Sequence, residues 1–80
     1  MRYYQHIRDH RQTTLDEEGD DFACLDDAKS SAIEAVREMA SARIKSGLII
    51  EDEHLDLCDE AGTVLVSLSF CDVVRQQLRH

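Results

Sequence analysis

The sequence contains no tryptophan, and its aromatic rings other than histidine are limited to two tyrosines and two phenylalanines. Hydrophobic residues still make up 42% of the 80 residues, so one core can form from mainly aliphatic side chains. A chain of this length corresponds to one small domain, and we predict a single domain over residues 1–80. Such a small core stabilises a fold only marginally, and self-association is a common way to bury more surface.

Glycine is also scarce, and its scarcity excludes several nucleotide-binding and catalytic motifs. All three glycines fall in predicted turns, and the sequence contains no P-loop, no G-x-G-x-x-G and no G-x-S-x-G pattern. No Ser-His-Asp or Cys-His signature can be assigned, and the carboxylates fall on predicted loops and turn tips. A small domain without pocket-forming insertions is a poor enzyme candidate. We therefore predict no catalytic activity and no cofactor.

The cysteines and the apolar segments are too few for a secreted or membrane-spanning protein. Three cysteines without a CxxC pair argue against a disulfide framework and are typical of free thiols in a reducing compartment. No apolar h-region follows the N-terminus, and the longest apolar run is far shorter than a membrane span. We expect a cytoplasmic protein that does not bind membranes.

Positive charge is the other scarce property. Nine Lys and Arg oppose 17 Asp and Glu, which gives a net charge of −8. This balance argues against non-specific binding to nucleic acid or to anionic membranes. The charge is unevenly distributed, however: residues 1–11 contain three arginines and one aspartate, whereas residues 16–27 contain seven carboxylates and no basic residue. A locally basic segment therefore precedes an acidic one.

The hydrophobic pattern predicts a strand over residues 3–9 and a long helix over residues 25–46. Alternation in the strand places Tyr3, Gln5 and Ile7 inward and the even-numbered residues outward. The helix carries one apolar face, made of Ala28, Ala32, Ile33, Val36, Met39, Ala40 and Ile44. Its cap is Cys24 or Asp26, of which Asp26 is the better capping residue type, and Gly47 follows as a C′ residue.

Between these elements lies a polar connection over residues 10–24. Thr13, Thr14 and Leu15 extend the sheet briefly in this interpretation, and Gly19 marks a turn that needs a positive φ. Phe22 is expected to anchor the connection beneath the helix. The connection thus carries one apolar side chain into the core.

Residues 53–70 predict a β-hairpin, and residues 71–79 a short helix with capping-box spacing at Ser69 and Asp72. We expect Leu57 to face Val64 and Leu55 to face Val66 around a four-residue loop over residues 59–62; a three-residue loop would turn Leu65 inward. The strand over residues 63–70 is the most apolar, so we place it at the centre of the sheet, with the first strand beside it. The predicted fold is α+β in the order β-α-β-β-α, a small antiparallel or mixed sheet with the long helix on one face.

The sequence offers four candidate metal sites, and none is predicted. His6 and His10 are four residues apart, which suits a helix, but on a strand they lie about 13 Å apart, beyond the reach of one ion with bonds of about 2 Å. The same reasoning applies to His54 and Cys58. His6 and His54 would approach only if the first two long strands were neighbours. The acidic run departs from a calcium-binding loop at its sixth and twelfth positions, and a preceding helix is missing.

Four motifs spread over nearly the whole chain resemble a family of short domains without assigned function, common in soil alpha-proteobacteria. The motifs are Arg2-Tyr3-Tyr4-x-His6-Ile7-Arg8-Asp9, Leu15-Asp16-Glu17-Glu18-Gly19, Leu25-x-x-Ala28 and Asp59-Glu60-x-Gly62. The chain departs from the family's usual Phe at Gln5 and from its usual capping residue at Cys24. The resemblance implies a small α+β fold and a cytoplasmic setting, and it transfers no activity or functional residue.

These observations favour a non-catalytic interaction or regulatory domain. It would bind a protein partner, or a second copy of itself, through the sheet face that the long helix leaves open. The residues that we predict to contact the partner are Tyr4, His6, Arg8 and Leu65. The alternative is a small nucleic-acid-binding or antitoxin-like regulator that uses the basic first strand, with Arg2 and Arg11 as additional contacts. The net charge makes nucleic acid the less favoured partner.

Overall fold

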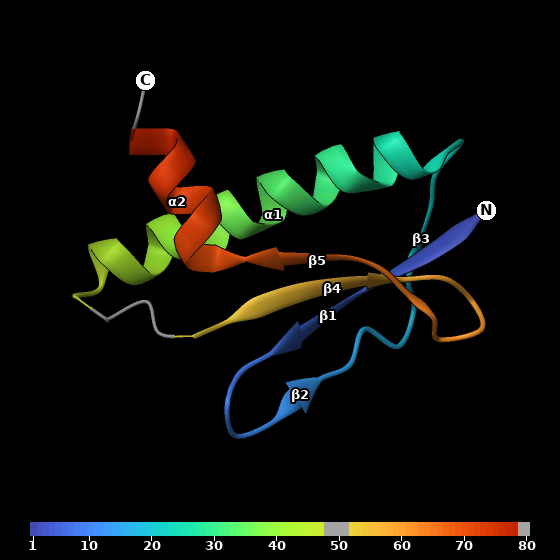
Figure 1. Cartoon of the computed structure of the whole chain (residues 1–80), viewed down its shortest axis with the longest axis horizontal. Helices are drawn as coiled ribbons and strands as arrows, with labels where there is room; N and C mark the ends of the chain where they lie inside the picture. The colour runs from blue at the N-terminus through green and yellow to red at the C-terminus, as the bar shows by residue number, and fades with distance from the viewer. Residues whose placement is uncertain (48–51, 79–80) are drawn as a thin grey trace.

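The computed structural model describes residues 1–47 and 52–78 and confirms a small α+β fold in which one long helix packs on an antiparallel sheet (Figure 1). The long elements follow the predicted order β-α-β-β-α, and two short strands are added between the first strand and the long helix. The elements are β1 (Arg2–Arg8), β2 (Thr13–Thr14), β3 (Asp20–Asp21), α1 (Leu25–Lys45), β4 (His54–Cys58), β5 (Val64–Ser69) and α2 (Phe70–Leu78). No helix in the described part of the chain is long and apolar enough to cross a membrane.

The strand order differs from the prediction. The sheet runs β2-β1-β4-β5, with β3 also beside β1, so β4 is central and β5, which we placed at the centre, forms an edge. Tyr4 to Arg8 of β1 pair with Cys58 to His54 of β4. Apolar content misled the prediction because the polar Asp56 of β4 is paired with Arg8 and Ser67 on the two neighbouring strands, whereas Val64 and Leu65 of the more apolar β5 remain exposed.

The hairpin register also differs, because its loop is one residue shorter than predicted and a β-bulge follows it. Asp59 donates its N–H to the carbonyl of Thr63, which closes a three-residue loop, and Gly62 has a φ of +85°. Cys58 lies opposite Val64, but Leu57 lies opposite Val66, so Leu65 is the extra residue of the bulge. The shorter loop puts Val64 outward, against our prediction. The bulge then restores Val66 and Leu68 to the inner face.

The core lies between the inner face of the sheet and the two helices. Tyr3 of β1 and Leu55 and Leu57 of β4 pack there against Phe70 of α2 and against three small or β-branched residues of α1, Ala28, Ala32 and Val36. The two leucines have no exposed surface, and burying each side chain stabilises the fold by about 1.5–3 kcal/mol. Because both helices contact this face, neither of them covers the opposite face of the sheet, which we describe as open for residues 1–47 and 52–78.

The remaining predictions for the long helix and for the connection that precedes it are confirmed in part. Gly19 and Gly47 have positive φ values of 70° and 76°, as predicted. Phe22 packs against the core beside Tyr3, with their ring centroids 6.1 Å apart. The N-cap is Cys24, one of the two predicted candidates, and it makes no side-chain hydrogen bond to the first turn. The prediction that Ile44 lies on the packed face of the helix is wrong. Ile44 is 58% exposed because it lies beyond the last buried turn.

Candidate interaction surface on the open sheet face

The open face carries the outward side chains of three neighbouring strands in three rows. Strand pairing places His6 opposite Asp56 and Asp56 opposite Ser67, which forms the middle row. The outer rows are Tyr4–Cys58–Val64 and Arg8–His54–Ser69. The predicted alternation of β1 is therefore confirmed, with its even-numbered side chains outward. We call these nine residues the open face.

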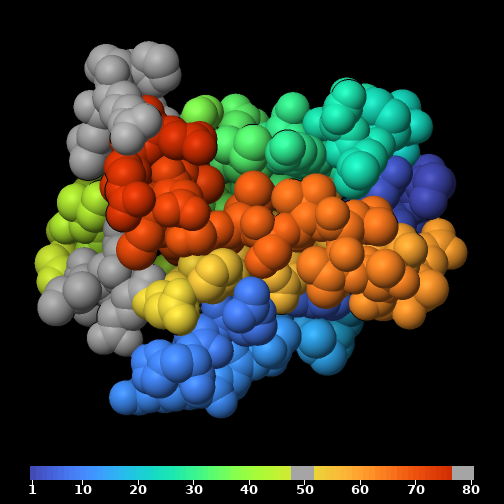
Figure 2. Space-filling model, in the orientation of Figure 1, coloured from blue at the N-terminus to red at the C-terminus, as the bar shows by residue number. Residues whose placement is uncertain are grey.

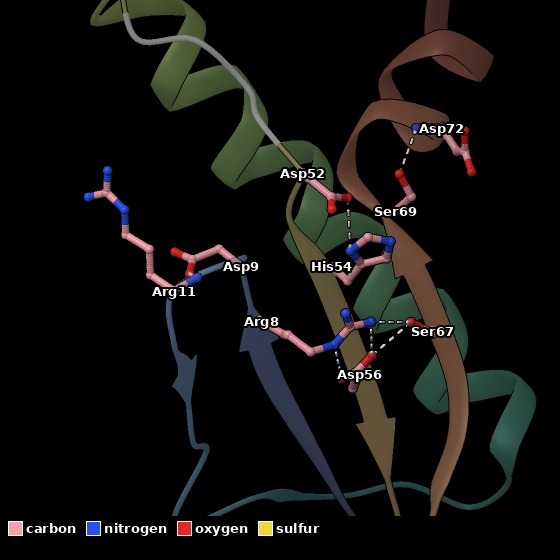
Figure 3. Close-up of polar contacts among 9 residues, drawn as sticks. All are labelled: Arg8, Asp9, Arg11, Asp52, His54, Asp56, Ser67, Ser69 and Asp72. Carbon is pink, nitrogen blue, oxygen red and sulfur yellow. Dashed lines mark hydrogen bonds and ion pairs between the residues drawn. The ribbon is translucent and has the colours of Figure 1, made fainter.

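An ion pair at the centre of the open face links all three strands (Figure 3). Arg8 Nε donates to Asp56 Oδ2 over 2.9 Å, and the Ser67 hydroxyl donates to Asp56 Oδ1 over 2.7 Å. Arg8 Nη2 lies 3.4 Å from both Asp56 Oδ1 and Ser67 Oγ. The hydrogen bond from Arg8 lowers the pKa of Asp56 against the opposing effect of burial, and Ser67 lowers it further. Asp56 is 8% exposed, so this carboxylate is a structural ion-pair partner that faces away from the core.

The next row places His54 beside the acidic start of β4. His54 Nδ1 is 3.5 Å from Asp52 Oδ1, and the two side chains approach each other at the start of β4 in Figure 3. Ser69, in the same row, accepts the N–H of Asp72 over 3.4 Å and so caps α2 at the predicted spacing. This row thus joins the open face to the start of α2.

His6, in the middle row, and Tyr4, in an outer row, lie next to the loop between β2 and β3. Their rings are stacked, with centroids 6.3 Å apart. The N–H of Asp16, in that loop, donates to His6 Nδ1 over 3.0 Å. Asp16 Oδ2 in turn accepts the backbone N–H of Gln5 over 3.1 Å. Burial raises the pKa of Asp16, but three backbone N–H donors, from Gln5, Gly19 and Glu18, together hold it below its ordinary value.

The predicted partner-binding residues are therefore divided between two places. Tyr4, His6 and Arg8 line up along β1 on the open face. Leu65 is separated from them by β4, in the bulge of β5, where it is 39% exposed beside Val64, which is 54% exposed. Figure 2 shows β5 and the β4–β5 turn at the surface, in orange, between α1 in green and the start of the chain in blue. The surface hence has a polar centre and an apolar margin.

The geometry does not assemble a metal site from the described residues, where no three His, Cys, Asp or Glu side chains are placed to hold an ion. His6 and His54 do lie on neighbouring strands, which the sequence left as an alternative. However, His6 uses Nδ1 to accept an N–H, and Cys58 is 2% exposed. Burial raises the pKa of the Cys58 thiol, so the thiolate that a metal requires is disfavoured. His10 follows the end of β1 and lies outside the strand.

Sequence reasoning missed the two residues that organise the open face. Asp56 lies between two leucines of a strand. This pattern could have indicated an ion pair, because an outward carboxylate in a central strand needs a cation on a neighbouring strand. Asp16 was interpreted only as part of a solvated acidic run. A third missed contact joins α1 to the start of β4: Arg43 lies 2.8 Å from Glu53, and its guanidinium lies 5.1 Å from the ring centroid of Phe70.

Comparison with curated proteins and with solved structures found no match to this chain. Comparison with protein families found a match over residues 2–71, which include β1 through β5 and the first two residues of α2. The matched family is described as a domain of unknown function, DUF6894. This agrees with the resemblance of the four motifs to a family of small domains without assigned function. The match covers the whole open face, and the chain belongs to the DUF6894 family.

Proposed function

We propose that this chain is a non-catalytic interaction or regulatory domain of the cytoplasm that binds a protein partner, or a second copy of itself, through the open face. One observation carries the proposal. Both helices contact the inner side of the sheet, and Tyr4, His6 and Arg8 stand on the other side. A three-stranded polar and aromatic surface without a covering helix is a typical place for another chain to dock.

The composition of the surface supports a protein partner. Tyrosine and arginine are enriched at protein interfaces, where they combine apolar area with directed hydrogen bonds. Here Tyr4 and Arg8 lie on one strand, and exposed Val64 and Leu65 provide an apolar margin. The Asp56 carboxylate is already paired with Arg8, so the centre of the surface can be covered without leaving that carboxylate uncompensated.

Nucleic acid is the less favoured partner, because most of the arginines that would contact phosphate already bind carboxylates of this chain. Two of the three arginines in the basic segment are engaged by carboxylates. Arg2 is 3.1 Å from Asp21 and also donates to the Glu18 carbonyl, and Arg8 is 2.9 Å from Asp56. Phosphate would have to displace these intramolecular partners on a protein of net charge −8. A mobility-shift assay at low salt tests this alternative: a shift that is lost in Arg11→Ala would support it over a protein partner.

The main test compares two exposed apolar positions. Leu65→Asp places a charge at the margin of the open face, whereas Ile44→Asp is a matched control on α1, where the residue is 58% exposed. Light scattering and a concentration series of amide NMR spectra would measure self-association. Quantitative pull-down with both variants would measure partner capture.

We expect Leu65→Asp to weaken self-association or capture of one specific partner, and Ile44→Asp to leave both unchanged. Shift changes on dilution should map to the residues of the open face. The proposal would be wrong if the protein is a monomer at every concentration and both variants capture the same proteins as the unaltered chain.

A further inference from the structure

The outer edge of β1 is closed by a side chain where strand pairing stops. At its two ends β1 pairs with β3 through Arg2 and Tyr3 and with β2 through Ile7 and Arg8. Gln5 lies between these pairs, and its N–H donates to Asp16 Oδ2 instead. Residues 15–19, which we call the edge segment, therefore complete the edge by a carboxylate rather than by a strand.

A second bond holds the edge segment, and it depends on the protonation of a histidine. The N–H of Asp16 donates to Nδ1 of His6 over 3.0 Å. A ring nitrogen that accepts a hydrogen bond carries no proton, so the ring is neutral with its hydrogen on Nε2. A protonated imidazole donates from both nitrogens and would set its Nδ1–H against the N–H of Asp16. We propose that His6 is a pH-sensitive latch, which holds the edge segment against β1 when neutral and releases the Asp16 N–H when protonated.

The charged groups around His6 favour the released state once the ring is protonated. The Asp16 carboxylate lies in the edge segment, and Asp56 stands opposite His6 on β4. Arg8, two residues along the strand, already neutralises Asp56, and Tyr4 contributes only its stacked ring. The Asp16 carboxylate accepts hydrogen bonds from backbone N–H groups. A charged ring that turns toward either carboxylate gains attraction and gives up the amide of Asp16.

The residues of the edge segment are joined through one carboxylate, so a change at Asp16 affects the whole segment. Asp16 Oδ1 accepts the N–H of Gly19 over 3.1 Å and that of Glu18 over 3.4 Å, so the segment folds around the same carboxylate. At its far end Gly19 packs against the Tyr3 carbonyl and the Tyr4 ring. Release at Asp16 consequently alters the edge of β1 at Gln5 and the surroundings of Tyr4. The latch does not rest on the proposed function, because it acts within one chain.

Nuclear magnetic resonance tests the latch directly. We expect the ¹⁵N shifts of His6 at high pH to show the hydrogen on Nε2. As pH falls and the His6 ring gains a proton, the Asp16 amide shift should change in step with the ¹⁵N shifts of His6. Hydrogen exchange at the Asp16 amide, corrected for its intrinsic pH dependence, should become about tenfold faster, as expected for the loss of one hydrogen bond.

Three variants separate the latch from general loosening of the fold. Asparagine at position 6 supplies an acceptor oxygen near Nδ1 that does not titrate, so His6→Asn should keep the Asp16 amide protected over the whole range. His6→Leu should leave that amide unprotected at every pH, and His54→Gln should retain the normal response. The latch is refuted if neutral His6 carries its hydrogen on Nδ1, or if the Asp16 amide changes identically in His6→Asn and in the unaltered chain.

Discussion

Replacement of Gly19 by alanine should destabilise this protein far more than the same change at Gly62. Both glycines have a positive φ, 70° at Gly19 and 85° at Gly62. A β-carbon on Gly19 would lie 2.8 Å from the Tyr3 carbonyl oxygen and 2.9 Å from the Tyr4 ring, whereas one on Gly62 would meet nothing within 4 Å. The pair therefore separates the backbone penalty, which both positions share, from the steric contact, which only Gly19 has.

The expected magnitudes follow from these two contributions. The left-handed conformation costs an alanine about 1–2 kcal/mol, and the smaller conformational entropy of the unfolded alanine chain offsets about 0.4–1 kcal/mol of that cost. Gly62→Ala should consequently lower the free energy of unfolding by about 1 kcal/mol. Overpacking against the Tyr3 carbonyl adds about 1–3 kcal/mol at Gly19, because backbone cannot move aside as a flexible side chain can.

Urea denaturation followed by circular dichroism measures both free energies, and thermal melts provide a second reading. For a domain of this size, a difference of 1 kcal/mol shifts the melting temperature by about 4–8 °C. Gly19→Ala should melt well below Gly62→Ala. If the two variants differ by less than about 0.5 kcal/mol, within the usual range for surface changes, the close packing of the edge segment on β1 is refuted.

Three further predictions concern the core, the ion pair and the thiols. Leu57→Ala should lower the free energy of unfolding by about 2–5 kcal/mol, whereas Ile44→Ala should change it by less than about 0.5 kcal/mol; equal losses in urea denaturation would contradict the placement of the core. The depressed pKa of Asp56 stabilises the fold above the unfolded value of about 3.9, and this contribution is lost as pH falls through the folded pKa. Asp56→Asn should therefore flatten the acid limb of stability against pH, and an unchanged slope would refute the contribution of the ion pair. In native protein a thiol reagent should modify exposed Cys24 rapidly and buried Cys58 only after unfolding; equal rates would refute the burial of Cys58.

The hairpin shows which features of a strand pair a hydrophobic pattern predicts and which it does not. Alternation correctly placed Leu55, Leu57, Val66 and Leu68 on one face, because burial of one side of a strand fixes which residues share it. It did not predict which residues pair, because a shorter loop and a bulge together change the pairing and still leave all four side chains opposite apolar partners. Several loops satisfy one hydrophobic pattern, and only the closing hydrogen bonds of Asp59 select among them.

For the polar residues of the open face, too, the sequence predicted the side of the strand but not the partners. The sequence placed Tyr4, His6 and Arg8 on one side of β1, since strand geometry alternates side chains whatever the neighbouring strand is. Their partners followed from strand order, which composition predicted wrongly. Only when β4 lies beside β1 does Asp56 come within reach of Arg8, and only then is a carboxylate between two leucines compensated.

The sequence by itself determined the α+β class, the long helix with its small-residue face, the faces of the strands apart from Val64, and the need for turns at Gly19 and Gly62. These are local properties, because they depend on periodicity and on backbone conformations accessible within a few residues. The tertiary structure decided the central position of β4, the ion pair of Arg8 with Asp56 and the closure of the β1 edge by Asp16. Those features join residues far apart in the chain, and their energies depend on which groups are brought together in a partly buried setting, which no local pattern specifies.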